Sequence, residues 1–208
     1  MIIQADLLVK DQLVTFFTAL RADAALVDRL FPTRPLAERT EIKAFFQNNV
    51  LPIRLGYPRN VADLPGVFLI LGMLGETDRG QTIGEVLSET VTSTTFTEEH
   101  GSHFSGVVKC SCMTENGNLT VWLQSLVFAA LLLAREDLNT LGIEEQKLSA
   151  ADFEPMPQWF PSFVFRRDVS LSMTVPITAP KDFLKIADIE VTALPLAASQ
   201  SVVVTAHQ

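Results

Sequence analysis

The chain has 208 residues, a formal net charge of −8 and only 19% charged residues against 48% hydrophobic ones. The acidic balance argues against a nucleic-acid-binding surface, which would need basic patches to replace phosphate counterions; it is compatible with a passive conduit for DNA. So much apolar content with so few charges suggests surface that a partner covers, and the alternative is a compact apolar monomer.

Cysteine content and hydropathy restrict the compartment. Cys110 and Cys112 lie two residues apart, too close for an easy disulfide, so a reducing compartment fits. The N-terminus lacks the basic start and apolar core of a signal peptide. The longest strongly apolar run, residues 126–134, is far short of the ~20 residues that a bilayer requires. We expect a soluble chain made inside the cell, without membrane contact.

Two helices are predicted near the N-terminus. Residues 7–31 carry apolar side chains at helical spacing and end before Pro32. A second, short helix is expected over residues 37–50. The five apolar residues 67–71 follow a Pro-Gly pair, which predicts a fully buried strand.

Residues 83–114 are rich in Thr, Ser and Val and poor in helix-forming residues, which predicts a long β-hairpin. We expect the turn at residues 98–102, where charged residues, His100 and Gly101 cluster. The run from Thr90 to Thr97 is too polar to be core on both faces. The tip of the hairpin is therefore expected to project from the body.

The helix predicted over residues 119–138, with Asn118 as its N-cap, is apolar almost all the way round. A helix of this kind must be buried on nearly all sides. We expect a sheet on one side of it and the helix of residues 7–31, or a neighbouring subunit, on the other. Gly142 is expected to close its C-terminus.

Residues 143–153 predict an irregular strand, and residues 163–175 predict a half-buried antiparallel strand. In the second, Arg166 and Asp168 lie on the polar face, whereas Arg167 falls on the apolar face, where it is expected to snorkel or to pair with a carboxylate. The fold class is therefore α/β of the α+β kind. It has a mixed, mostly antiparallel sheet with a long hairpin, flanked by the N-terminal helix and the very apolar helix. Residues 1–180 form one domain, and residues 181–208 form an extended C-terminal arm.

Candidate chemistry is sparse. His100 and His103 with Glu98 and Glu99 have metal-ligand side chains, but their spacing matches no zinc motif. Gly75 and Gly80 have the spacing of a phosphate loop but lack the lysine that it requires. No G-x-S-x-G element supports a serine nucleophile. We expect no enzyme activity, no cofactor and no metal.

The order of these elements resembles the tail terminator proteins of tailed bacteriophages, more specifically those of contractile-tailed phages. The resemblance covers residues 58–175. It is carried by residues 65–70, 115–116, 119–138, 141–143, 148–152 and 165–171. It implies a ring, usually of six subunits, that caps the finished tail tube, ends tail assembly and joins the tail to the head.

The partners implied are further copies of the chain, the tail tube protein, the sheath protein and a head–tail neck protein, with DNA as passive cargo and no membrane. The chain would be assembled in the host cytoplasm and reside in the virion tail or neck. The hairpin is expected to face the ring lumen or the tube. The residues expected at interfaces are Thr92, Thr94, Phe96, Glu98, Glu99, His100, His103, Phe104, Arg166 and Asp168.

Two other functions remain open. A neck ring protein, a stopper or adaptor, would share the ring and the acidic charge. A small α/β hydrolase or ligand-binding module would instead be a monomer or dimer with a pocket.

Overall fold

The computed structural model describes residues 4–56, 64–72, 75–76, 85–91, 95–152, 164–184, 188–192 and 203–207. Side chains are described in these ranges except for residues 76, 85–91, 95–100 and those from 178 onward. The chain divides into two compact units. The larger contains residues 3–77 and 103–176, and the smaller contains residues 1–2, 78–102 and 177–208.

Helices form one layer of the larger unit. They are α1 (Ala5–Ala22), α2 (Ala25–Leu30), α3 (Leu36–Asn48), α4 (Gly117–Leu133) and α5 (Arg135–Thr140). α3 confirms the short helix predicted over residues 37–50. The single helix predicted over residues 7–31 is wrong, because the chain breaks at Asp23. The Oδ1 atom of Asp23 accepts a hydrogen bond from Ala25 N at 3.0 Å, a local side-chain bond that competes with a continuous helix.

Strands form the second layer. Those with residues in the larger unit are β1 (Ile53–Leu55), β2 (Gly66–Leu71), β3 (Gly75–Glu76), β5 (Thr95–Thr114), β6 (Glu144–Asp152) and β7 (Phe165–Leu184). They are ordered β1-β2-β5-β7-β6, and β3 also pairs with β5. β1 runs parallel to β2, whereas the β2–β5, β3–β5 and β6–β7 pairs are antiparallel. β2 confirms the buried strand, and the whole confirms an α+β fold with a mixed, mostly antiparallel sheet.

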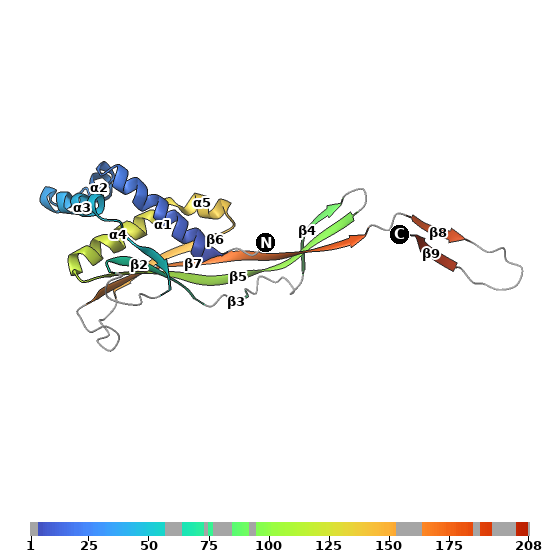
Figure 1. Cartoon of the computed structure of the whole chain (residues 1–208). Coiled ribbons are helices and arrows are strands. Elements are labelled where there is room, and N and C mark those ends of the chain that lie inside the picture. The colour runs from blue at the N-terminus through green and yellow to red at the C-terminus, as the bar shows by residue number, and fades with distance from the viewer. Residues whose placement is uncertain are drawn as a thin grey trace, which may run out of the picture. The chain divides into compact units, whose positions relative to one another are not determined.

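The helices lie on one side of this sheet, which we call the helix face (Figure 1). Thr114 of β5 hydrogen-bonds Thr120 of α4 at 2.7 Å, so the alternate β5 residues Val108, Cys110 and Cys112 share that face. All three are fully buried. Lys109, Ser111 and Met113 therefore lie on the opposite side, the back face.

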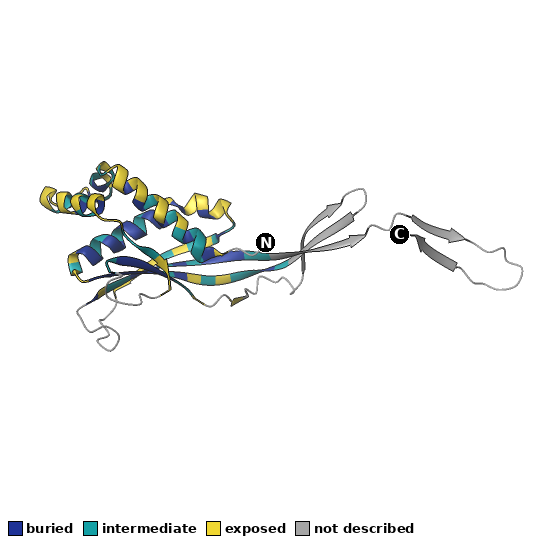
Figure 2. Cartoon of the chain, in the orientation of Figure 1, coloured by how far each residue is buried: buried dark blue, intermediate teal, exposed yellow. Residues whose placement is uncertain are grey.

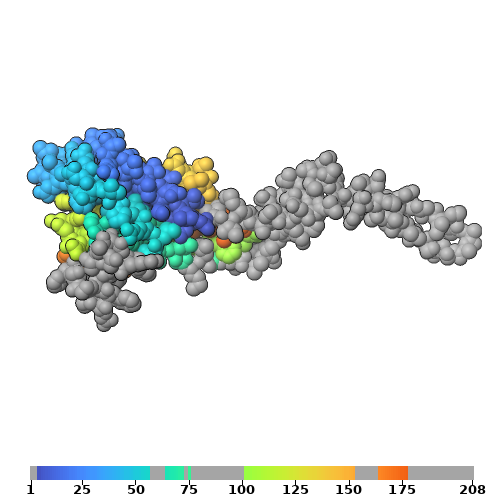
Figure 3. Space-filling view, viewed as in Figure 1, coloured from blue at the N-terminus to red at the C-terminus, as the bar shows by residue number. Residues whose placement is uncertain are grey.

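α4 is buried along most of its length (Figure 2), as its apolar circumference predicts. It contacts β6 of the sheet and also α1, and the Trp122 indole donates to Glu38 of α3 at 2.8 Å. α1, α2 and α3 form a continuous surface on the side of the molecule seen in Figure 3. Two apolar residues of α4 are not buried: Leu132 and Leu133, at its C-terminal end, are 48% and 65% exposed.

The ends of the apolar helix differ from the prediction. The N-cap is Asn116, whose side chain accepts from the backbone N–H groups of Asn118 and Leu119. The predicted single helix is two, since α4 ends at Leu133 and α5 follows after Ala134. No side chain explains that break. The predicted glycine cap is confirmed after α5: Gly142 has φ +90°, and Ile143 N donates to Leu138 O at 2.9 Å in a Schellman arrangement.

β6 and β7 match their predictions in most respects. β6 is irregular, with a register shift between Glu144 and Lys147. On β7, the side chain of Arg167 donates to Gln124 of α4 at 3.3 Å and pairs with Asp152 at 3.1 Å, which confirms the expected carboxylate partner. The even-numbered residues of β7 consequently lie on the back face. That face is more buried than predicted, because Asp168 is only 5% exposed.

In the smaller unit, β4 (Glu85–Val91) pairs antiparallel with the first part of β5, which confirms the hairpin. The predicted turn at residues 98–102 is wrong. Four of the expected turn residues lie within β5 and have cross-strand partners on β4: Glu98, Glu99, His100 and Gly101. The chain reverses between Val91 and Thr95, and residues 92–94 lie outside the described residues. Charged side chains are as compatible with a β-ribbon as with a turn, so their clustering did not locate the reversal.

The smaller unit also contains a two-stranded antiparallel sheet of β8 (Asp188–Thr192) and β9 (Val203–His207). The division into residues 1–180 and an arm of residues 181–208 stays a prediction. Within the part of the chain that the structure describes, no helix has the length and hydropathy of a membrane span.

Candidate functional site

The predicted interface residues fall into three groups. Thr92 and Thr94 lie outside the described residues. Phe96, Glu98, Glu99 and His100 lie on β5 opposite β4, and only their backbone is described. His103, Phe104, Arg166 and Asp168 lie in the larger unit with their side chains described.

The structure brings Arg166 and Asp168 together on the back face. The Arg166 Nε and Nη2 atoms donate to the two carboxylate oxygens of Asp168, both at 2.9 Å, which is a bidentate pair. The Lys109 Nζ atom lies 3.8 Å from Asp168 Oδ2. Asp168 is therefore a nearly buried carboxylate that pairs with two cations, Arg166 from its own strand β7 and Lys109 from the neighbouring strand β5.

His103 and Phe104 are adjacent in β5 and consequently lie on opposite faces. By strand alternation His103 shares the back face with Lys109 and Ser111, whereas Phe104 does not. Both are partly buried. The sequence prediction missed Lys109 and Ser111, although the alternation of polar residues with Cys110 and Cys112 was a usable signal for a polar back face.

The two cysteines lie behind this cluster on the helix face. Burial, with a smaller contribution from the Asp168 charge, raises the pKa of Cys110 to about 12. Burial, Cys110 and Asp168 raise the pKa of Cys112 well above its usual value. Both thiols are thus neutral at physiological pH and poorly suited to act as nucleophiles or metal ligands.

One cavity of about 300 Å³ lies between the end of α3 and β1. Its lining residues are Phe45, Asn49, Val50, Leu51, Pro52, Arg54, Leu64 and Pro65. The sequence prediction did not anticipate it. Polar atoms make up the larger part of its exposed lining, but it contains no carboxylate, histidine, cysteine or hydroxyl group, so it offers no acid–base pair.

The described ranges contain no group of three or more His, Cys, Asp or Glu side chains that could hold a metal ion. On the back face, the described side chains include the charge cluster of Lys109, Arg166 and the nearly buried Asp168, and the fully buried Ser111. Neither a scan against protein-family models nor a search of curated proteins found a match to the chain.

Proposed function

We propose that the chain is a structural subunit of a ring, with six copies as the expected number, that caps the tail tube of a contractile-tailed bacteriophage and joins the tail to the head. The observation that carries the proposal is the length of two strands. β5 and β7 have 20 residues each, against roughly 5–6 for a typical strand.

These strands are longer than the helical layer requires. Only part of each strand has buried residues on the helix face of the larger unit. These residues lie within residues 108–114 of β5 and 167–175 of β7. On one side, the remaining residues of β5 pair with β3, which has two residues, and with β4, which has seven. Narrow β-ribbons are marginally stable alone in water, so contact with a neighbouring chain would stabilise them.

Exposed apolar side chains offer further contact surface. Leu132, Leu133 and Leu141 are exposed around α5, and Leu36 and Val50 are exposed at either end of α3. Two separate apolar regions on one subunit suit the head-to-tail interfaces of a closed ring, in which each subunit presents a different surface to each neighbour.

The proposed partners follow from the resemblance in element order. The ring would contact the tube protein below it, sheath at its periphery and a neck protein above it, and DNA would pass through it. The β4–β5 hairpin, with Phe96 to His100, is the segment we assign to the lumen or tube. Arg166 and Asp168 would then stiffen the sheet that carries the hairpin.

Imaging tests the proposal. Purified full-length protein should give closed rings in negative-stain electron microscopy and a matching mass in mass photometry. It should co-sediment with tail tubes that lack their terminal ring. A particle that stays monomeric at micromolar concentration both alone and with tubes would contradict the proposal.

The same sedimentation assay distinguishes a neck protein from a protein that caps the tail tube. A neck stopper or adaptor would sediment with filled heads and leave tubes unbound. The α/β hydrolase or ligand-binding alternative has the cavity beside α3 as its only support, and that lining contains no catalytic pair. We therefore place it behind both ring functions.

A further inference from the structure

The open edge of β6 is the feature that carries a further inference. β6 pairs with β7 on one side, and among the described strands nothing pairs with its other side. All four residues from Ser149 to Asp152 are exposed. Ala150 lies opposite Val169, which is fully buried on the helix face, so the helices cover β7 here but leave the side chain of Ala150 exposed.

The backbone groups that face this edge can be identified. Gln124 Nε2 donates to Ala151 O at 3.3 Å and to Asp168 O at 3.2 Å. One nitrogen can reach both oxygens only if they lie between the two strands, which makes Ala151 and Asp168 a hydrogen-bonded pair. The neighbouring pair, Ala150 and Val169, is then non-hydrogen-bonded, so the N–H and C=O of Ala150 point outward.

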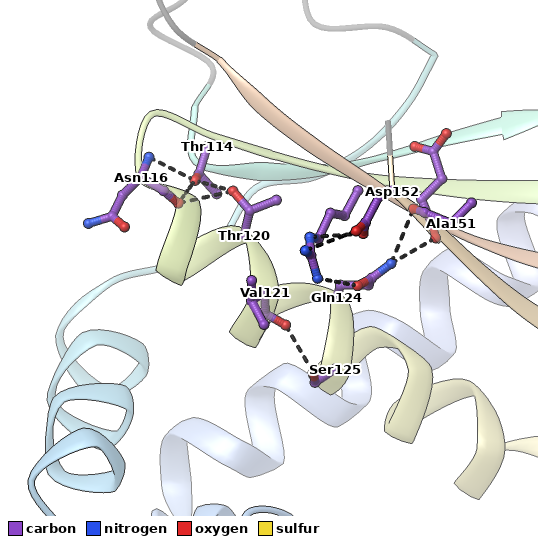
Figure 4. Close-up of polar contacts among 10 residues, drawn as sticks. Thr114, Asn116, Thr120, Val121, Gln124, Ser125, Ala151 and Asp152 are labelled. Carbon is purple, nitrogen blue, oxygen red and sulfur yellow. Dashed lines mark hydrogen bonds and ion pairs between the residues drawn. The ribbon is translucent and has the colours of Figure 1, made fainter. Parts of the chain in front are cut away.

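This edge is held in place from the helix side. Gln124 also accepts a hydrogen bond from Arg167 at 3.3 Å, and Arg167 pairs with Asp152 at the end of β6. Figure 4 shows the side chain of Gln124, from α4, reaching Ala151 of β6. A strand fixed in this way loses little conformational entropy when another strand adds to it.

The edge also lacks the usual protection at its centre. Natural edge strands avoid pairing through charges, proline or bulges. In β6 the register shift and the charged residues Glu144, Glu145 and Lys147 lie in the first half, whereas residues 148–151 are Leu-Ser-Ala-Ala, without charge, proline or glycine. The second half of β6 is therefore a template for strand addition.

The same chain contains a strand pair that is not part of the main sheet. β8 and β9 form a two-stranded sheet of five residues each, separate from the main sheet. A hairpin of this size is at best marginally stable by itself. Its sequence is rich in β-branched residues, with Ile189 and Val191 in β8 and Val203, Val204 and Thr205 in β9.

We propose that the β8–β9 hairpin of one copy adds, through β9, to the open edge of β6 in a neighbouring copy. The inference rests on the proposed ring, and it names the contact that joins adjacent subunits. It accounts for both incomplete elements at once, since the edge gains a strand and the hairpin gains a sheet.

The proposed ring places further copies of the chain beside each subunit, so the occupant we assign to the edge is the hairpin of a neighbouring copy.

Cysteine cross-linking tests the contact. Ala150→Cys in one tagged copy is mixed with Val203→Cys, Val204→Cys or Thr205→Cys in a differently tagged copy, and disulfides are read on non-reducing gels. Paired strands bring opposite Cα atoms within about 5.5 Å, which a disulfide can span. Native Cys110 and Cys112 are fully buried and should not compete.

We expect a cross-linked band containing both tags for at least one of the three mixtures. Ala150→Cys alone cross-linking to itself would mean that two β6 edges pair, which would overturn the inference. Rings without any mixed cross-link would overturn it and leave the ring intact. A monomeric parent protein under the same conditions would overturn the ring and the contact together.

A matched pair of variants gives a second readout. Ala150→Pro removes the outward N–H without touching the bonds to β7, and Ala150→Val keeps it. With the folded state unchanged by circular dichroism, Ala150→Pro should raise the concentration needed for rings about tenfold, as expected for one lost backbone hydrogen bond. Equal ring formation by both variants would contradict the role of this edge.

Discussion

The helix face and the back face of the main sheet are made by the same strands but are built differently. On the helix face, Val108, Cys110 and Cys112 of β5 are fully buried among apolar neighbours. On the back face, Phe68 and Met113 are buried in a small apolar cluster with Val164, and Lys109 lies 3.8 Å from the nearly buried carboxylate Asp168. The buried strand residues of the helix face are thus held mainly by packing, whereas the back face combines a small apolar cluster with charge pairing.

The difference has a consequence for stability. A site held by packing tolerates apolar substitution of similar volume, whereas a buried charge pair is strongly destabilised when one partner is removed.

The largest expected effect tests the packed face. Leu126 of α4 is fully buried, and Leu126→Ala should lower the free energy of unfolding by about 2–5 kcal/mol through lost burial and the cavity left behind. Urea unfolding followed by circular dichroism measures the change. Leu133→Ala, at an exposed position of the same helix, is the control and should change it by less than about 0.5 kcal/mol. Equal effects would mean that α4 is not core.

The next effect tests the charged face. Asp168→Asn keeps the shape of the side chain but leaves Arg166 without its bidentate partner. The free energy of unfolding should fall by about 2–4 kcal/mol, somewhat below the range for a fully buried pair because Arg166 retains some exposure. Asp152→Asn breaks the Arg167 pair, in which the carboxylate is 70% exposed, and should cost less than about 1 kcal/mol. A larger loss in the control would invert the proposed difference between the two sites.

The thiols provide a pH-dependent test of the packed face. The folded-state pKa of Cys110 is about 12 against 9.0 for an ordinary cysteine. Above pH 9 the unfolded chain ionises this thiol while the folded chain does not, so its contribution to stability is complete below pH 9 and declines as pH rises toward 12. At about pH 10 the loss should be roughly 1 kcal/mol.

Cys110→Ala isolates this contribution. The difference in unfolding free energy between the parent and the variant should be constant below pH 9 and shrink above it. A thiol-specific colorimetric reagent at mildly alkaline pH should leave both cysteines unmodified until denaturant is added. Rapid modification of the folded protein would contradict their burial.

Sequence patterns predicted the elements better than their ends. The continuous apolar run of residues 67–71 identified β2, and the hydrophobic alternation of residues 163–175 identified β7, because a strand buried on both faces is apolar throughout and a half-buried strand alternates. The turn was misplaced because Glu98 to Gly101 form a cross-strand register with β4, and register is a long-range property. The back-face cluster was half found, since Asp168 was predicted and its partner Lys109 belongs to another strand.

The smallest expected effect on the free energy of unfolding concerns the N-cap of α4, where two asparagines lie two residues apart. Asn116 accepts from Asn118 N at 2.9 Å and Leu119 N at 3.3 Å, so Asn116→Ala should lower the free energy of unfolding by about 1 kcal/mol. Asn118 lies inside the first turn, and Asn118→Ala should be neutral or stabilising by a few tenths of a kcal/mol. Urea unfolding of both variants distinguishes the two positions. A larger loss from Asn118→Ala would restore the cap to the position that the sequence first suggested, and α4 would then begin deeper in the apolar run.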